Sequence, residues 1–352
     1  MKTSSAKGRM AADIAPGEEA HGLFLIGAAA LQQARNGPFW RIELRDATGS
    51  LEARIWSPAS REYGELPAGR IAAIEGRAEM FRDQMQVGIN RLRLLEEEET
   101  GQLDLADFLA SSSRPAGDML AEIEAMCRSE LRHKPWRKLM ASLLRDEDIR
   151  ARLLTATAAR NVHHAWAGGL LEHMLGVARL CLALAGLYPE LDRQILLVGA
   201  LTHDLGKLWE LSGGLTNDYT DEGRLVGHTG LGLEKLAPHI RKSGLEPELA
   251  LHLRHLVLSH HGLPEYGAAR EPLTAEAFAL HHADNVDARL AQLRVLFEGL
   301  GPEASAWSPY QTTLKRAIFR AAHTPGEGTA PERSGNRQAD DKTLREEQCS
   351  LL

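Results

Sequence analysis

The chain has 352 residues, 43% of them hydrophobic and 25% charged, and carries a formal net charge of −7. This composition is typical of a globular protein long enough for two domains, and the negative charge excludes a protein that simply coats nucleic acid. The three cysteines lie far apart in the sequence. This spacing argues against a disulfide framework and favours a reducing cytoplasm. No apolar run approaches the roughly 20 residues that cross a bilayer, and the N-terminus lacks the apolar segment of a secretory signal.

Both ends of the chain are polar and contain few apolar anchors. Residues 1–18 and 323–352 are therefore expected to be disordered tails. Between them the changes in pattern predict a first domain at 19–95, an acidic connection with leading helices at 96–160, and a second domain at 161–322.

From about residue 21 to 95 the hydrophobic residues recur with a period of two, as in β-strands. The alternation is clearest in the segments PFWRIEL, SLEARIW, GRIAAIEGRAEMF and QMQVGINRLRLL. In the first segment Trp40, Ile42 and Leu44 share one face, and in the second segment Leu51, Ala53 and Ile55 do. Five strands in about 75 residues predict a small closed barrel of the OB type.

After the acidic run Glu96 to Glu99 the period becomes helical. The expected helices are DMLAEIEAMCRSELR, PWRKLMASLLRD, AGGLLEHMLGVARLCLALAG, RQILLVGALTHDLGKLWEL, PELALHLRHLVLSHH and TAEAFALHHADNVDARLAQLRVLFEGL. Gly, Pro and Asn separate them. The predicted fold class is multidomain α+β, with a five-stranded OB-type barrel followed by an all-α domain that has no further strands.

Histidine and aspartate residues interrupt the apolar helices of the second half. The segment LTHDLGK places His203 and Asp204 side by side among apolar residues, and a buried pair of this kind needs a partner that satisfies both. The other candidate ligands come from separate apolar segments and are His173, His228, His260 and Asp284. Bundles build internal metal sites from facing helices in this way. Imidazole and carboxylate ligands without thiolate favour Mn²⁺, Fe, Mg²⁺, Co²⁺ or Zn²⁺.

Simpler interpretations exist for each residue alone. A single histidine in an apolar helix is usually a satisfied core residue, and His203 with Asp204 is equally expected as a hydrogen-bonded pair at a helix end. Independent core histidines, however, have no reason to recur in similar apolar contexts on several helices. The recurrence favours a metal site.

The ordered set H…HD…D at His173, His203, Asp204 and Asp284 resembles the HD superfamily of metal-dependent phosphohydrolases. The longer phrases NVHHAWAGGLLEHML, LTHDLGK, GHTGLG, VLSHHG and ALHHADNVDARL, with LRDATGSLEARIW in the barrel, are similar to those of the bacterial 3′-to-5′ exoribonucleases of the YhaM type. Proteins of that family carry an OB-fold before an HD domain. The resemblance covers about residues 20 to 320 and keeps this order.

The resemblance implies that His173, His203, Asp204 and Asp284 hold one metal ion. It also implies a second ion held by His228 and His260, with Asp204 bridging the two. The expected activity is hydrolysis of single-stranded RNA from the 3′ end to nucleoside 5′-monophosphates by metal-activated water, with Mn²⁺ favoured. Single-stranded DNA stays open as a further substrate, no membrane partner is expected, and a homo-oligomer stays open.

Three further residues of the second half are candidates for the reaction. Lys207 follows His203 by four residues, so on a helix both would project from one face. We assign Lys207 to phosphate or transition-state charge, although a solvated lysine at a helix end is equally expected. His261 and His164 are candidates for substrate binding or proton transfer.

The barrel indicates the class of substrate. OB-folds bind single strands by stacking bases on aromatic side chains and by placing basic residues along the phosphates. The face opposite the apolar set carries Phe39, Arg41, Arg54 and Trp56. A simpler interpretation is that Phe39 and Trp56 cap the barrel core.

Two other functions are consistent with this pattern. One is an HD-type phosphodiesterase of small nucleotides that uses the barrel as a partner-binding module, because a fold does not determine a substrate. The other is an adaptor without catalysis. The complete ligand set disfavours the adaptor, and the barrel disfavours the small-nucleotide enzyme.

Overall fold

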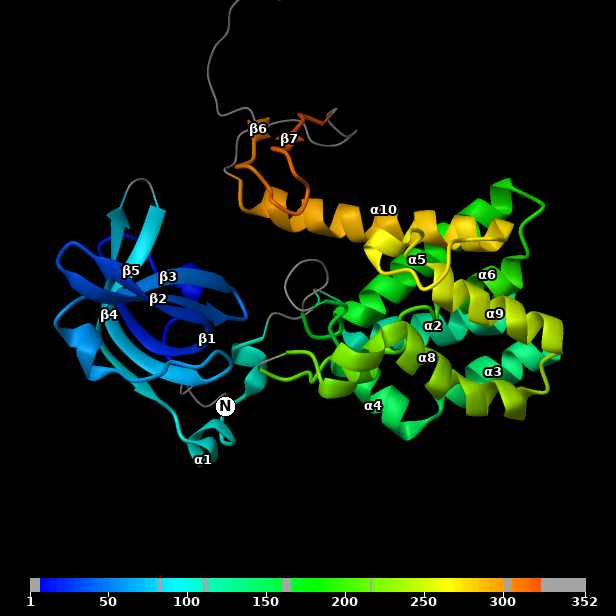
Figure 1. The fold of residues 1–352 in the computed structure, drawn as a ribbon, viewed down its shortest axis with the longest axis horizontal. Helices are drawn as coiled ribbons and strands as arrows, with labels where there is room; N and C mark the ends of the chain where they lie inside the picture. The colour runs from blue at the N-terminus through cyan, green and yellow to red at the C-terminus, as the bar shows by residue number, and fades with distance from the viewer. Residues whose placement is uncertain are drawn as a thin grey trace, which may run out of the picture. The chain divides into compact units, whose positions relative to one another are not determined.

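The computed structural model describes residues 7–81, 84–109, 112, 114–159, 166–215, 217–300 and 305–323. A closed five-stranded barrel comes first in the chain and a helical region follows it (Figure 1). This confirms the predicted fold class. By its internal contacts the chain divides into two units, Met1–Val295 and Leu296–Leu352.

The barrel has the strand order β1-β2-β3-β5-β4 and closes on itself. Its strands are β1 (Glu19–Ala34), β2 (Gly37–Asp46), β3 (Gly49–Ile55), β4 (Ile71–Phe81) and β5 (Gln84–Leu94). Strands β3 and β5 are parallel, and the other four neighbouring pairs are antiparallel. The predicted inward residues Ile42, Leu44, Leu51 and Ile55 lie in the barrel core, so the alternation in the sequence identified the correct face.

Residues 7–18 are not a free tail, contrary to the sequence analysis. The Nζ atom of Lys7 lies 2.7 Å from Oδ2 of Asp46, and both side chains are fully buried. The short helix η1 (Ala11–Asp13) follows, and Ile14 is part of the barrel core. The prediction failed because one buried ion pair and two apolar side chains anchor this segment, a signal too sparse to show as a period. Residues 1–6 and 324–352 of the expected tails lie outside the described residues.

The helices of the second half agree with most of the predicted segments. They are α1 (Glu97–Thr100), α2 (Ala116–Glu130), α3 (Lys134–Leu144), α4 (Glu147–Thr155), α5 (Gly169–Leu187), α6 (Arg193–Ala200), α7 (Lys207–Glu210), α8 (Asp221–Ser243), α9 (Pro247–Ser259) and α10 (Ala275–Glu298). Short 3₁₀ turns are η2 (Ala59–Glu62), η3 (Leu105–Asp107) and η4 (Pro264–Tyr266). The helices α1, α4 and α8 were not among the predicted segments. In α8 the backbone kinks at Gly227, where φ is 74° and ψ is 160°.

The predicted helix over residues 193–211 is interrupted. Helix α6 ends at Ala200, a turn occupies residues 201–206, and α7 begins at Lys207. All residues from Ile195 to Ala200 are buried, so α6 is enclosed on every side. The turn that follows is also buried, and this places polar side chains in the interior.

Helix α5 is long and apolar enough to cross a membrane by length and composition, which the sequence analysis did not expect of any segment. Its mean hydropathy is 1.6 over the most apolar window, 44% of which is buried inside the structure. Leu170, Leu171, Met174 and Leu175 of α5 belong to the core of the helical region. Buried core helices commonly have this composition.

Two short strands follow α10, although no strands were expected after the barrel. They are β6 (Ala306–Trp307) and β7 (Phe319–Arg320), which pair antiparallel. Two residues per strand are too few for a period of two to show in the sequence.

Candidate metal centre

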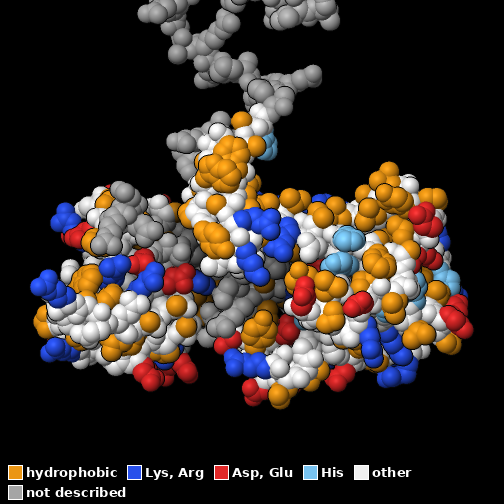
Figure 2. All heavy atoms as spheres, turned by 45° about the horizontal axis from the view of Figure 1, so that its top comes forward, with side chains coloured by type: hydrophobic (Ala, Val, Ile, Leu, Met, Phe, Trp, Pro, Cys, Tyr) orange, Lys and Arg blue, Asp and Glu red, His pale blue; other side chains and the backbone are white. Residues whose placement is uncertain are grey.

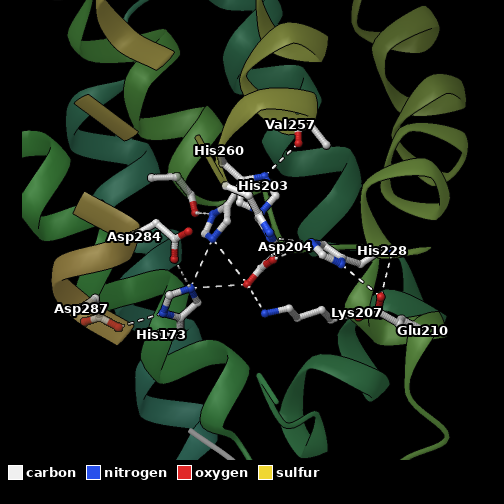
Figure 3. A network of polar contacts seen from close by, with 12 residues as sticks. His173, His203, Asp204, Lys207, Glu210, His228, Val257, His260, Asp284 and Asp287 are labelled. Atoms are coloured by element: carbon white, nitrogen blue, oxygen red, sulfur yellow. Dashed lines mark hydrogen bonds and ion pairs between the residues drawn. The ribbon is translucent and has the colours of Figure 1, made fainter. Parts of the chain in front are cut away.

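The six residues predicted as metal ligands come together inside the helical region (Figure 3). His173 lies on α5, and His203 with Asp204 lies in the buried turn after α6. The others are His228 on α8, His260 directly after α9, and Asp284 on α10. Five separate segments therefore contribute polar side chains to one place.

One group surrounds Oδ2 of Asp204 and is called cluster one: His173, His203, Asp204 and Asp284. The Nε2 atom of His173 lies 3.4 Å from this oxygen and 3.2 Å from Oδ1 of Asp284. The Nε2 atom of His203 lies 3.5 Å from the same Asp204 oxygen and 3.2 Å from Nε2 of His173. Two imidazole nitrogens and two carboxylate oxygens thus face a common point.

A second group surrounds Oδ1 of Asp204 and is called cluster two: Asp204, His228, His260 and His261. The Nε2 atoms of His228 and His260 each lie 3.5 Å from this oxygen. The Nε2 atom of His261 lies 3.1 Å from Nε2 of His228. His261 was predicted to bind substrate, yet its nitrogen lies among the candidate ligand atoms, all of which are within 4.8 Å of one another.

The hydrogen bonds made by the Nδ1 atoms determine whether the Nε2 atoms, which face the clusters, carry a proton or a free lone pair. The Nδ1 atoms of His203, His260 and His261 contact the backbone carbonyls of Ala200, Val257 and Tyr266 at 2.9, 2.8 and 2.7 Å. A carbonyl oxygen can only accept, so each Nδ1 carries the proton. The Nε2 lone pair of each neutral ring then points into the clusters, as in histidines that bind metal.

Carboxylates hold the two remaining rings. Nδ1 of His173 donates to Oδ2 of Asp287 at 2.8 Å, and Nδ1 of His228 donates to Oε1 of Glu210 at 3.1 Å. Each cluster therefore contains one histidine held by a carboxylate (Figure 3). Such a partner raises the basicity of the ligand and fixes its orientation.

The donor set fits a divalent cation. Oδ1 of Asp204 and Nε2 of His260 are buried, and neither has a hydrogen-bond partner among the described residues. Both atoms are acceptors and face each other, which is unfavourable unless a cation lies between them. Burial lowers the pKa of His260 to about 3, so this ring is neutral at pH 7. Proton transfer to His260 therefore cannot satisfy the pair at that pH, whereas a metal ion can.

Cluster one also favours positive charge. Burial opposes a charge on His173, but hydrogen bonds to Asp204, Asp284 and Asp287 outweigh burial and hold the pKa of this imidazole well above its usual value. Because metal ligands must be deprotonated, a bound ion would displace that proton. The carboxylates thus favour a cation at this point, whether proton or metal.

Lys207 lies at the edge of the two clusters. Its Nζ is 2.7 Å from Oδ2 of Asp204, and its side chain is 13% exposed. Burial opposes its charge, but the charge of Asp204 outweighs burial and raises the pKa of Lys207. The predicted reason for its position, a continuous helix with His203, is wrong because of the turn over residues 201–206. The contact with Asp204 nevertheless brings its ammonium group to the centre.

Two glycines allow the helices to approach closely enough. A Cβ atom on Gly206 would lie 1.8 Å from the backbone oxygen of His228, so this glycine lets α8 approach the turn. A Cβ atom on Gly176 would lie 2.1 Å from Oδ1 of Asp287. Gly176 thus provides space for the carboxylate that holds His173.

The barrel carries an aromatic stack on the face opposite its core. The rings of Phe39 and Trp56 are 4.8 Å apart and 26° from parallel. The guanidinium carbon of Arg54 lies 5.7, 5.4 and 5.5 Å from the rings of Phe39, Trp56 and Phe81. Trp56 is 44% exposed and Phe81 46% exposed, so aromatic surface faces solvent.

Glu52 holds the two predicted arginines of this face. Its Oε2 accepts from Nη2 of Arg41 at 2.6 Å, and its Oε1 accepts from Nη2 of Arg54 at 2.8 Å. The three charges leave a net charge of +1. Hydrogen bonds from Arg54 and Arg41 outweigh burial and lower the pKa of Glu52, so the carboxylate is ionised at pH 7.

The family model for the HD domain matches residues 170–289, which include all residues of both clusters. The curated 3'-5' exoribonuclease YhaM of Bacillus subtilis is 32% identical over 298 residues, which is 84% of this chain and 93% of that protein. This chain belongs to the YhaM 3'-5' exoribonuclease family. Another member of the family, from Halalkalibacterium halodurans, is 33% identical over 81% of this chain and 88% of its own length.

Solved structures similar to the chain include OB-folds. One is the second OB-fold domain of replication protein A from Methanococcus maripaludis, with 17% identity, a TM-score of 0.22, and coverage of 25% of this chain and 95% of that chain. Another is the single-stranded DNA binding protein from Thermus aquaticus, with 20% identity, a TM-score of 0.21, and coverage of 22% of this chain and 40% of that chain.

The sequence analysis missed three residues of this chain that contact the candidate metal ligands or Arg54 beside the aromatic stack: Asp287, Glu210 and Phe81. Asp287 lies three residues after Asp284, so one turn of α10 separates them, and this spacing could have identified it. Glu210 and Phe81 gave no comparable signal, because their contacts come from segments distant in sequence. The predicted substrate residue His164 lies outside the described residues.

Proposed function

We propose that this chain is a metal-dependent 3′-to-5′ exoribonuclease that hydrolyses single-stranded RNA to nucleoside 5′-monophosphates. The observation that carries the proposal is the arrangement of two ligand groups on opposite oxygens of Asp204 in a member of the YhaM family. An HD domain acting on nucleotide phosphodiesters needs such a centre and no covalent nucleophile.

Two ions per chain are proposed, one in each cluster, with Asp204 between them. His173, His203 and Asp284 would complete the first site, and His228 and His260 the second. His261 is proposed as a further ligand of the second site, because its Nε2 lies beside that of His228. The oxygen and imidazole donors suit Mn²⁺. Bound divalent ions would lower the pKa of a water molecule and neutralise charge on the phosphate oxygens.

The side chains of the protein would orient this centre and the phosphate. Lys207 is proposed to donate to a non-bridging phosphate oxygen, because its ammonium group already lies at the edge of the clusters. Asp287 and Glu210 would hold the rings of His173 and His228 in place during the reaction. Hydrolysis breaks the bond between phosphorus and the ribose O3′, the water oxygen bonds to phosphorus, and a proton ends on O3′.

The exposed ring of Trp56, which stacks on the buried ring of Phe39, is the proposed contact for the bases of the RNA strand. Stacking on aromatic side chains is tolerant of sequence, as a degrading enzyme requires. Arg41 and Arg54 would contact phosphates of the strand. Single-stranded DNA carries the same bases and phosphates, and we propose it as a secondary substrate.

The direct test is hydrolysis of a 5′-labelled single-stranded RNA with Mn²⁺, beside a panel of mononucleotides and cyclic dinucleotides. We expect a ladder that shortens from the 3′ end, nucleoside 5′-monophosphates as products, and no activity on RNA with a 3′-phosphate. Hydrolysis of a small nucleotide far faster than of any oligonucleotide would instead support a small-nucleotide phosphodiesterase.

The role of the barrel is tested by Trp56→Ala. Loss of one stacking contact costs about 1–3 kcal/mol, so the KM for a long oligonucleotide should rise about 5- to 150-fold. Hydrolysis of a chromogenic phosphodiester should not change. Tyr188→Ala, which removes another exposed aromatic residue, is the matched control. Equal activity of the Trp56 variant on long RNA would make the barrel a partner-binding module.

A further inference from the structure

The segment after α10 forms a small hairpin that presents aromatic rings to solvent. Trp307 and Phe319 lie directly opposite each other in the register of β6 and β7. Their ring centroids are 5.0 Å apart, with planes inclined by 47°. Trp307 is 68% exposed, Phe319 45%, and the nearby Tyr310 65%. Figure 2 shows hydrophobic side chains exposed on this segment.

The hairpin is held by hydrogen bonds that leave these rings on its surface. The backbone nitrogen of Ser308 donates to the carbonyl of Ile318 at 2.8 Å, and the nitrogen of Ile318 donates to Oγ of Ser308 at 3.0 Å. The Nη1 atom of Arg320 donates to the carbonyl of Phe297 at 3.0 Å. Ser308 is buried, whereas its neighbour Trp307 faces outward. The hydrogen bonds of the hairpin therefore hold the rings of Trp307 and Phe319 at its surface.

The same hairpin is basic in an acidic protein. Residues 305–323 include Lys315, Arg316 and Arg320 and contain no Asp or Glu, while the whole chain has a net charge of −7. Lys315 and Arg316 are exposed at the turn, and neither makes an ion pair within the described part of the chain. Their charges are thus not balanced locally, so they are available to an anionic partner.

We propose that this hairpin is a binding surface for single-stranded RNA, in addition to the stack on the barrel. Exposed aromatic rings next to cations match the two parts of a single strand, since bases stack on rings and phosphates attract the cations. The inference rests on the proposed function for the identity of its ligand. A symmetric contact between two copies of the hairpin is less suitable, because it would bring the cations of both copies together, whereas RNA supplies anions.

The test uses the full chain and measures binding separately from hydrolysis. A fluorescent single-stranded RNA of about 20 nucleotides is titrated with protein in EDTA, and the Kd is followed by anisotropy over a series of salt concentrations. The double variant Trp307→Ala/Phe319→Ala should weaken binding at least about fivefold through lost stacking. A plot of the logarithm of the association constant against the logarithm of the salt concentration has a negative slope. In the variant Lys315→Gln/Arg316→Gln this slope should be less steep by about 1.4, or about 0.7 for each lost phosphate contact.

Matched controls are Tyr188→Ala for an exposed aromatic residue and Arg137→Gln/Lys138→Gln for adjacent exposed cations on α3. Neither control should change the Kd or the slope. Hydrolysis of a chromogenic phosphodiester with Mn²⁺ should stay at the wild-type rate in all variants. The charge variant leaves the aromatic pair intact and keeps the test valid if the aromatic variant misfolds by circular dichroism.

If the wild-type chain degrades RNA but both hairpin variants keep the wild-type Kd and salt slope, the hairpin inference is overturned and the proposed function stands. Sedimentation that shifts to a smaller species in the aromatic variant, with RNA affinity unchanged, would also overturn it and assign the surface to a second copy. If the wild-type chain degrades no RNA at all, the proposed function fails instead.

Discussion

The Nδ1 atom of His173 lies 2.8 Å from Oδ2 of Asp287, and this contact directs Nε2 of the same ring toward Asp204 and Asp284. The carboxylate of Asp287, which is not a member of cluster one, thus orients the candidate ligand His173. Glu210 has the same relationship to His228. Each cluster therefore contains one imidazole held by a carboxylate.

Replacing Asp287 by alanine should weaken binding of Mn²⁺ to cluster one by about 10- to 100-fold, because the imidazole of His173 loses its orientation and basicity. Titration calorimetry on metal-free protein measures this affinity. Asp287→Asn retains an acceptor oxygen and should keep more of the affinity than Asp287→Ala. Equal affinity of the alanine variant and the wild type would contradict a positioning role.

Asp204→Asn should abolish turnover while the fold is retained. Asparagine preserves the shape of the side chain but removes the charge that both clusters share. Loss of a ligand common to two ions should cost at least about 3 kcal/mol of transition-state stabilisation, or more than 100-fold in rate. The rate on labelled RNA, with circular dichroism as the control, measures the effect. Activity above a hundredth of wild type would exclude the bridging role.

The number of ions is tested through cluster two. His228→Ala and His260→Ala should each lose one of two bound ions, while the ion of cluster one is retained, because His173, His203 and Asp284 are unchanged. His261→Ala should have the same effect if His261 is a ligand, and should leave two ions bound if it contacts substrate. Elemental analysis of dialysed protein distinguishes these results. One ion per chain in the wild type and in all three variants would indicate a mononuclear site.

The buried pair of Lys7 and Asp46 should make the stability of the barrel depend on acid pH. Burial raises the pKa of Asp46, but hydrogen bonds from Lys7 and Thr48 outweigh it, so the pKa in the folded state lies below the usual value. The stabilisation is therefore complete above a pH of about 3.9 and is lost as pH falls through the folded-state pKa.

Thermal melting between pH 2 and 6 measures this dependence, and Asp46→Asn should reduce it. Lys7→Met at neutral pH leaves a carboxylate buried without its cation and should destabilise the barrel by about 3–5 kcal/mol. Arg9→Gln breaks the exposed pair with Glu18 and serves as the control, with a much smaller effect. The same melting temperature for Lys7→Met and the wild type would show that the buried ion pair adds no stability.

The local pattern of residues was sufficient to predict the barrel core and the candidate metal ligands of this protein. Alternation within β2 and β3 identified the residues of the barrel core, because successive side chains of a strand point to opposite faces. Histidines and aspartates in apolar segments identified six candidate ligands, because burial of such groups requires a common partner. These inferences depend on neighbours in the sequence, and so the sequence alone supported them.

Tertiary structure decided how those residues are arranged. The sequence could not show that opposite oxygens of Asp204 face different groups of histidines, because helices distant in sequence bring those groups together. Nor could it show that Nε2 of His261 lies beside that of His228, or that Glu210 holds His228. The apolar residues of the segment 201–206 fit a helical period and predict a helix, whereas the structure has a buried turn there. The polar sequence around Lys7 predicts a tail, but an ion pair with Asp46, 39 residues away, anchors this residue, and a local pattern cannot show such a distant contact.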